Sequence, residues 1–172
     1  ANALLPIFAK DVLQVGAKGY GVLAAAPAVG SLLAGGAISL LPAARRQGRV
    51  VIAAVYLYGL ATLGFGLSHW FWLSLLMLAG TGAADTVSTV LRQTIRQLLT
   101  PDRMRGRMTA VGMIFFMGGP QLGELEAGVV ARWVGAPWSV ITGGIGALIS
   151  AALIAWNAPA LRDYEASQPP SE

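Results

Sequence analysis

Cysteine is absent from the 172 residues, and the chain has a single histidine and little charge. Without cysteine there is no disulfide framework, thiolate nucleophile or Cys-based metal site, and one histidine cannot build a zinc site. Charged residues make up 12% of the chain, hydrophobic residues 55%, and mean hydropathy is +0.63, whereas a soluble domain carries about 25% charged residues. Too little charge is present to cover a water-exposed surface. The composition therefore predicts an integral membrane protein.

Five apolar segments are each long enough to cross a bilayer, which takes about 20 helical residues. They are residues 20–41, 50–68, 70–91, 108–131 and 137–156. A shorter apolar start, residues 3–13, is interrupted by Pro6, Lys10 and Asp11 and is interpreted as the last turns of another helix. We therefore expect an all-α membrane protein with five complete transmembrane helices and the end of a sixth. Because the chain opens without a basic signal-peptide region or an initiator Met, we also expect it to continue upstream.

Basic residues cluster in two connecting segments, residues 42–49 and 92–107, which are separated by two spans and so lie on one side. The first contains Arg45, Arg46 and Arg49, and the second contains Arg92, Arg96, Arg103, Arg105 and Arg107. The positive-inside rule assigns both to the cytoplasmic face of an inner membrane, with the C-terminus on the same side. Trp70, Trp72, Trp133 and Trp138 mark the opposite interface. Clustered loop arginines without interleaved aromatic residues argue against nucleic acid as a partner and favour the lipid bilayer.

Asp85 is a carboxylate inside the third span, with Thr81, Ser88 and Arg92 at helical spacings that predict one shared face. An unpaired, ionised carboxylate inside a membrane is costly, so such a residue either pairs with a cation or carries protons. Two interpretations follow: a static ion pair with an arginine of a neighbouring helix, or a role in transport.

A second polar group lies in the fourth span. Glu124 and Glu126 differ by about 200° around a helix, which argues against a catalytic pair of carboxylates. Glu124 shares its face with Gln121 and is the better candidate for a substrate or proton pathway. Gly118, Gly119 and Pro120, with Gly123 following, predict either a flexible bend or a site of close helix packing. No phosphate loop, Ser-His-Asp set or dinucleotide fingerprint is present, so we expect neither an enzyme nor a cofactor.

Residues 101–128 contain the motifs GRM, GGPQLGE and LEAG, and residues 3–13 and 25–35 read ALLPIFAKDVL and AAPAVGSLLAG. These three stretches together resemble siderophore exporters of the major facilitator superfamily, the group that includes enterobactin exporters. The resemblance implies a twelve-helix transporter that binds its substrate between two six-helix halves. Residues 1–164 would then form the C-terminal half, residues 165–172 a disordered cytoplasmic tail, and an N-terminal half would be the missing partner. Gly118, Pro120 and Gly123 are similar to the Gly-Pro antiporter motif of this superfamily, which implies a hinge.

The sequence thus predicts a proton-coupled exporter of a small organic molecule, a siderophore or drug, that works by alternating access. Asp85, Gln121 and Glu124 would form its substrate or proton pathway. A membrane scaffold or assembly subunit is the alternative. It would need no carboxylates within the membrane, so Asp85 and Glu124 would both lie against lipid or in sealed helix contacts rather than in a cavity.

Overall fold

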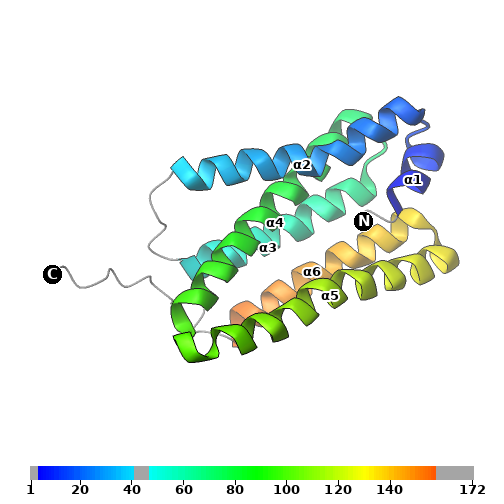
Figure 1. Ribbon diagram of the computed structural model, residues 1–172. Helices are drawn as coiled ribbons and strands as arrows, with labels where there is room; N and C mark the ends of the chain where they lie inside the picture. The colour runs from blue at the N-terminus through cyan, green and yellow to red at the C-terminus, as the bar shows by residue number, and fades with distance from the viewer. Residues whose placement is uncertain (1–3, 41–46, 158–172) are drawn as a thin grey trace.

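The computed structural model describes residues 4–40 and 47–157, and every long element within them is a helix. A short N-terminal segment combines one turn of α-helix with a π-helical turn, and it is followed by five long helices (Figure 1). The elements are α1 (Leu5–Ile7), η2 (Phe8–Val12), α2 (Ala17–Leu40), α3 (Gln47–Leu67), α4 (Phe71–Leu99), η3 (Asp102–Met104), α5 (Arg105–Val134) and α6 (Ala136–Asn157). The predicted all-α membrane fold is confirmed, and the expected N-terminal stub is helical. The predicted tail, residues 165–172, lies outside the described residues.

Helices α4, α5 and α6 extend beyond the apolar segments from which they were predicted. The third span was predicted to stop at Leu91, but α4 continues to Leu99. Much of the predicted loop 92–107 is therefore helix, because Arg and Gln are good helix formers and can extend a membrane helix into the interface. Residues 132–136 were likewise predicted as a connection, yet only Gly135 separates α5 from α6. Its φ of 90° is disfavoured for residues with a side chain, which explains how so short a turn forms.

The long helices alternate in direction, so their connections gather at two opposite ends (Figure 1). At one end α2 finishes, α3 begins, α4 leads into α5 and α6 finishes, which brings Arg49 to the same end as the arginines of residues 92–107. At the other end lie the α3–α4 and α5–α6 connections with Trp70 and Trp133, both largely exposed. The prediction that the two basic segments share one side is confirmed for the described part; Arg45 and Arg46 lie outside the described residues. We call these the basic end and the aromatic end.

Within the described residues, four helices are long and apolar enough to cross a membrane: α2, α3, α4 and α6. They correspond to four of the five predicted spans. The remaining predicted span lies in α5, which at 30 residues has sufficient length but is more polar. Gln121, Glu124 and Glu126 lower its hydropathy, and α5 is the helix with the least packing against the others.

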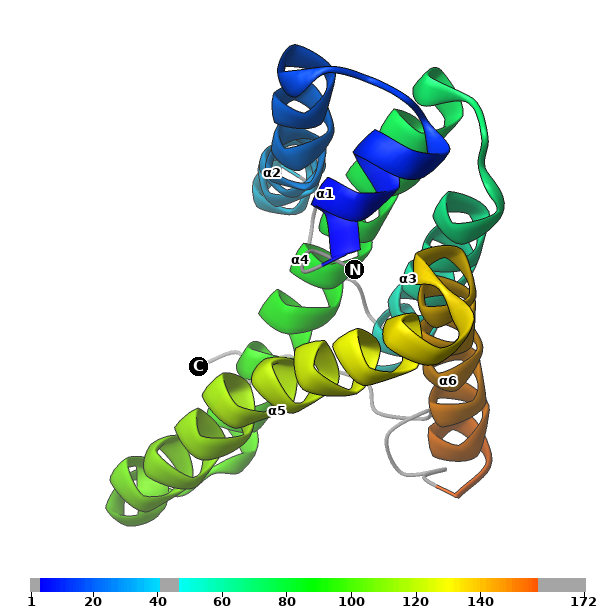
Figure 2. The same cartoon turned by 90° about the vertical axis from the view of Figure 1, so that its right-hand side faces the viewer.

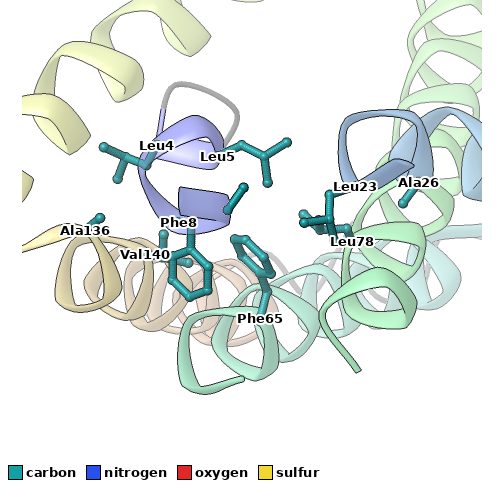
Figure 3. Close-up of a cluster of buried hydrophobic side chains, with 10 residues drawn as sticks. Leu4, Leu5, Phe8, Leu23, Ala26, Phe65, Leu78, Ala136 and Val140 are labelled. Atoms are coloured by element: carbon teal, nitrogen blue, oxygen red, sulfur yellow. The ribbon is translucent and has the colours of Figure 1, made fainter. Parts of the chain in front are cut away.

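Buried apolar side chains concentrate near the aromatic end (Figure 3). The N-terminal segment inserts between α6 on one side and α2 and α4 on the other, carrying Leu4, Leu5 and Phe8 into the centre. The Phe8 ring lies against Phe65 of α3, with ring centroids 4.5 Å apart. Beside this cluster, Ser74 donates a hydrogen bond to the Ser68 hydroxyl at 2.9 Å, which ties the start of α4 to the end of α3. The N-terminal segment therefore packs against α2, α3, α4 and α6 near the aromatic end.

Glycines bring two pairs of helices into close contact. A Cβ added to Gly82 of α4 would fall on the carbonyl of Pro27 in α2, and one added to Gly30 would fall on the carbonyl of Ala79. Ser31 strengthens this crossing by donating a hydrogen bond to the Gly82 carbonyl oxygen at 3.1 Å. Helices α3 and α6 are similar, since a Cβ on Gly144 would lie 2.8 Å from the Leu63 side chain. Close packing by small residues is thus confirmed at these crossings.

Helix α5 departs from this arrangement. Its C-terminal part packs on α6, where the Ser139 hydroxyl donates a hydrogen bond to the Ala127 carbonyl oxygen at 2.8 Å. Its N-terminal part runs away from α3 and α6 to meet the end of α4 (Figure 2). Added Cβ atoms at Gly118, Gly119 and Gly123 would meet nothing within 4 Å. The packing interpretation of these three glycines is therefore wrong for the described part of the chain.

Candidate functional site

A cavity of about 1260 Å³ lies between α4 and α5, extending from the middle of α4 to the basic end. Helix α4 supplies most of its polar side chains: Asp85, Thr89, Arg92, Gln93, Arg96 and Gln97. Helix α5 supplies most of its apolar ones, and its lining residues are Arg105, Met108, Thr109, Gly112, Met113, Phe116 and Pro120. The cavity therefore has a charged wall facing an apolar wall.

The predicted polar face of α4 is divided between two environments. Asp85 and Arg92 line the cavity and are exposed to it. Thr81 and Ser88 are buried against neighbouring helices, with the Thr81 hydroxyl donating a hydrogen bond to the Leu78 carbonyl oxygen at 2.7 Å. The four residues do share one side of the helix, as predicted, since at about 100° per residue they fall within a sector of about 60°. That sector straddles the boundary between the packed and the open side, with Thr81 and Ser88 toward the packed side.

Asp85 lies near the middle of α4, where its carboxylate faces the cavity. The Tyr58 side chain of α3 is close enough for an electrostatic interaction with it. Among the described residues Asp85 forms no ion pair with an arginine or lysine side chain. The static ion pair offered as one interpretation of Asp85 is therefore not found in this part of the chain.

Two arginines of α4 lie between Asp85 and the basic end. Arg92 is held by its own helix, because its Nε donates to the Ser88 carbonyl oxygen at 3.2 Å and its Nη2 to the Thr89 hydroxyl at 3.3 Å. The Arg96 guanidinium extends across to α5 and rests against Gly112, where an added Cβ would collide with Nη1. Sequence reasoning had assigned Arg96 only to a basic loop and had not selected Gly112. In the sequence, the contact was indicated only by the position of Gly112 within an apolar segment of the helix.

The segment Gly118–Gly123 contributes only Pro120 to the cavity wall. Gln121 and Glu124 are exposed and lie outside the cavity lining, as does Glu126. Helix α5 continues through Pro120 without interruption. The structure thus brings Asp85 and Pro120 to one cavity but does not bring Gln121 or Glu124 to it. The hinge role of Gly118, Gly119, Pro120 and Gly123 stays a prediction.

Of the other arginines at the basic end, Arg105 lines the cavity, whereas Arg103 and Arg107 are exposed outside its lining. Arg49 is also exposed and lies at the start of α3. Sequence reasoning had placed all of these residues in one class of loop arginines. The structure separates those that line the cavity from those that do not.

Long apolar helices around a charged cavity that begins at a mid-helix carboxylate are features of a multi-pass membrane transporter. A comparison with protein families agrees: residues 1–172 match the family described as transmembrane secretion effector, within the major facilitator superfamily. The chain belongs to this family. No curated protein and no solved structure matches the chain.

Proposed function

We propose that the chain is the C-terminal half of a proton-coupled exporter that moves a small organic molecule, a siderophore or drug, out of the cell by alternating access. The N-terminal half of the same transporter would complete the substrate site. The protein would lie in the inner membrane, with the basic end and the C-terminus in the cytoplasm. Membership of the family supports a role in transport. Protons as the coupling ion and a siderophore or drug as the cargo are proposed in addition.

The cavity-facing carboxylate of Asp85 carries this proposal. A carboxylate near the middle of a membrane helix is retained where it has a function, and a nearby cavity allows protons to reach it. Since no cation is paired with Asp85 among the described residues, a proton can bind its carboxylate without first displacing an arginine or lysine. Binding of a proton would then change the free-energy difference between the inward-open and outward-open states.

Glu124 and Gln121 take a secondary place in this proposal because they lie outside the cavity lining. We infer that they respond to the proton or the substrate only in another conformation, or where the N-terminal half contacts α5. The scaffold alternative required both carboxylates to avoid a cavity. Asp85 does not meet that requirement, so transport is the function that the geometry favours.

Efflux by the full-length protein tests the proposal. Cells lacking their own exporters would be loaded with a panel of fluorescent drugs and siderophores, and retention measured between pH 6 and pH 8. We expect lower retention of at least one compound, strongest at acidic external pH, and loss of this effect in Asp85→Asn. Glu126→Gln is the matched control, since it removes an exposed carboxylate outside the cavity. Retention unchanged by the protein for every compound would argue for the scaffold.

Access to the cavity can be measured independently of the cargo. The 172 residues lack cysteine. A cysteine introduced at one position is therefore the single reactive thiol in this part of the protein. With any cysteine elsewhere in the protein replaced, Thr89→Cys should react with a membrane-impermeant maleimide from the cytoplasmic side. Leu153→Cys, an exposed apolar position on α6, should face lipid and stay unlabelled. Equal labelling at both positions would contradict a water-accessible cavity.

A further inference from the structure

We propose that the cavity between α4 and α5 binds the anionic group of an amphiphilic organic anion, such as a carboxylate, through Arg92 and Arg96. The apolar wall of α5 would bind the rest of the molecule. The inference rests on the proposed function only in identifying this anion as the exported cargo.

The charge of the cavity lining supports an anion. Among the described lining residues, Asp85 is the single carboxylate beside Arg92 and Arg96, while Glu124 and Glu126 lie outside the lining. Arg105 also lines the cavity but has an interaction of its own, and the proposal does not depend on it. The cavity wall therefore has an excess of positive charge next to membrane, where lower polarity strengthens attraction for an anion.

The guanidinium groups of Arg92 and Arg96 are held in place before any ligand binds. Arg92 donates two hydrogen bonds to its own helix, at Ser88 and Thr89. Since a guanidinium has five N–H donors, several are left for a ligand. Arg96 reaches α5 with Nη1 first and occupies the space that a side chain at position 112 would take. Arginines held in this way lose little conformational freedom on binding, and their planar forks match the two oxygens of a carboxylate.

The opposite wall indicates what is attached to the anion. Met108, Met113 and Phe116 of α5 line the cavity and are otherwise exposed. Methionine adapts to varied shapes, and phenylalanine packs against flat apolar groups. A small inorganic anion would leave these side chains unused. An aromatic or aliphatic body attached to the anionic group would cover them.

The positions along α4 separate the anion from the proton site. Arg92 follows Asp85 by seven residues, which is about 10 Å along a helix. The anion would therefore bind nearer the basic end, while Asp85 stays available to a proton. A cytoplasmic basic end would allow the anion to enter from inside the cell, in the direction that export requires.

Equilibrium binding to the purified full-length protein tests this inference. The protein would be placed in nanodiscs of zwitterionic phosphatidylcholine and titrated with 2-naphthoate or with its uncharged analogue 2-naphthamide. We expect naphthoate to bind at least tenfold more tightly than naphthamide. Arg92→Gln and Arg96→Gln should each weaken naphthoate binding about tenfold, because each removes a charge-assisted hydrogen bond.

Arg107→Gln is the matched control. It removes the same charge from the same end, but Arg107 lies outside the cavity lining, so naphthoate affinity should not change. Melting temperatures of all variants without ligand would verify that each is folded. Equal affinities for naphthoate and naphthamide, or an equal loss in Arg107→Gln, would overturn the proposal.

Anionic lipid headgroups share this chemistry and need a separate measurement. If the arginines bind lipid rather than cargo, phosphatidylglycerol nanodiscs should raise the melting temperature in an Arg92- and Arg96-dependent way, with no naphthoate binding in phosphatidylcholine. That result would overturn the cargo assignment. Naphthoate binding that depends on both arginines, without any efflux, would overturn the export function and leave the anion site standing. Efflux without such binding would overturn the anion site alone.

Discussion

Helices α2 and α4 touch through their backbones, whereas α5 forms one wall of the cavity, and Gly118, Gly119 and Gly123 of α5 contact no neighbouring helix in the described part of the chain. Gly82 has no room for even one added carbon because the Pro27 carbonyl occupies it, yet Gly118 and Gly119 have nothing within 4 Å. Both regions look alike in sequence, as glycine-containing apolar segments. Glycine permits close approach in the first region and leaves a lightly packed helix in the second. The comparison separates a closely packed part of the bundle from the part that forms one wall of the candidate site.

The largest change in stability is expected at the crossing of α2 and α4. Gly82→Ala places a carbon on the Pro27 carbonyl, and backbone cannot move aside as a flexible side chain can. We expect a loss of about 1–3 kcal/mol in stability, as for other overpacked sites, measured as thermal unfolding in detergent. Gly36→Ala on α2, where an added Cβ meets nothing within 4 Å, is the control. Equal melting temperatures for the two variants would contradict the close contact.

The second-largest change in stability is expected where α5 packs on α6. Ser139→Ala removes the hydrogen bond from α6 to the Ala127 carbonyl, and interhelical bonds of this kind contribute about 0.6–1.7 kcal/mol in membranes. Ser39→Ala is the matched control, because Ser39 donates only to the Gly36 carbonyl of its own helix. We expect the first variant to melt lower than the second. The opposite order would mean that α5 is held by contacts other than this one.

A smaller change in stability is expected at Gly112. Gly112→Ala displaces the Arg96 guanidinium, the end of a flexible side chain, so unfolding should shift by less than about 1 kcal/mol. Maleimide labelling of Thr89→Cys should nevertheless change, because Arg96 lines the same cavity. In an Arg96→Gln background the effect of Gly112→Ala on labelling should disappear. If the effect persists unchanged, the two residues are not coupled.

A small gain in stability, rather than a loss, is expected at Gly119. Because an added Cβ meets no neighbour, Gly119→Ala should stabilise the helix by up to about 1 kcal/mol through backbone entropy alone. If Gly118, Gly119 and Pro120 form a hinge, efflux should fall although the protein is more stable. Unchanged efflux would remove the hinge prediction. Gly106→Ala, also an open position on α5, controls for a general stiffening of the helix.

The membrane class, the number of long helices and the common side of the basic segments were all predictable from the chain. Length and hydropathy are local properties, and alternation of spans then determines which connections share an end. Asp85 was also selected from the sequence because a membrane carboxylate has few stable environments. The structure places it in the cavity lining, and its role in transport stays a prediction. Arg96 and Gly112 were missed as a pair, since sixteen residues separate them and only the divergence of α5 from the bundle sets their contact.

Composition and hydropathy by themselves therefore determined that this protein is a bundle of membrane helices with its arginines at one end. Each helix forms its own backbone hydrogen bonds, so a helical span needs no information from elsewhere in the chain. Only the tertiary structure decided which polar residues belong together: Asp85, Arg92 and Arg96 in one cavity, with Gln121 and Glu124 outside it. Membership of a cavity depends on how helices cross, and the glycine contacts that set those crossings join residues about fifty positions apart, such as Gly30 with Ala79 and Gly82 with Pro27.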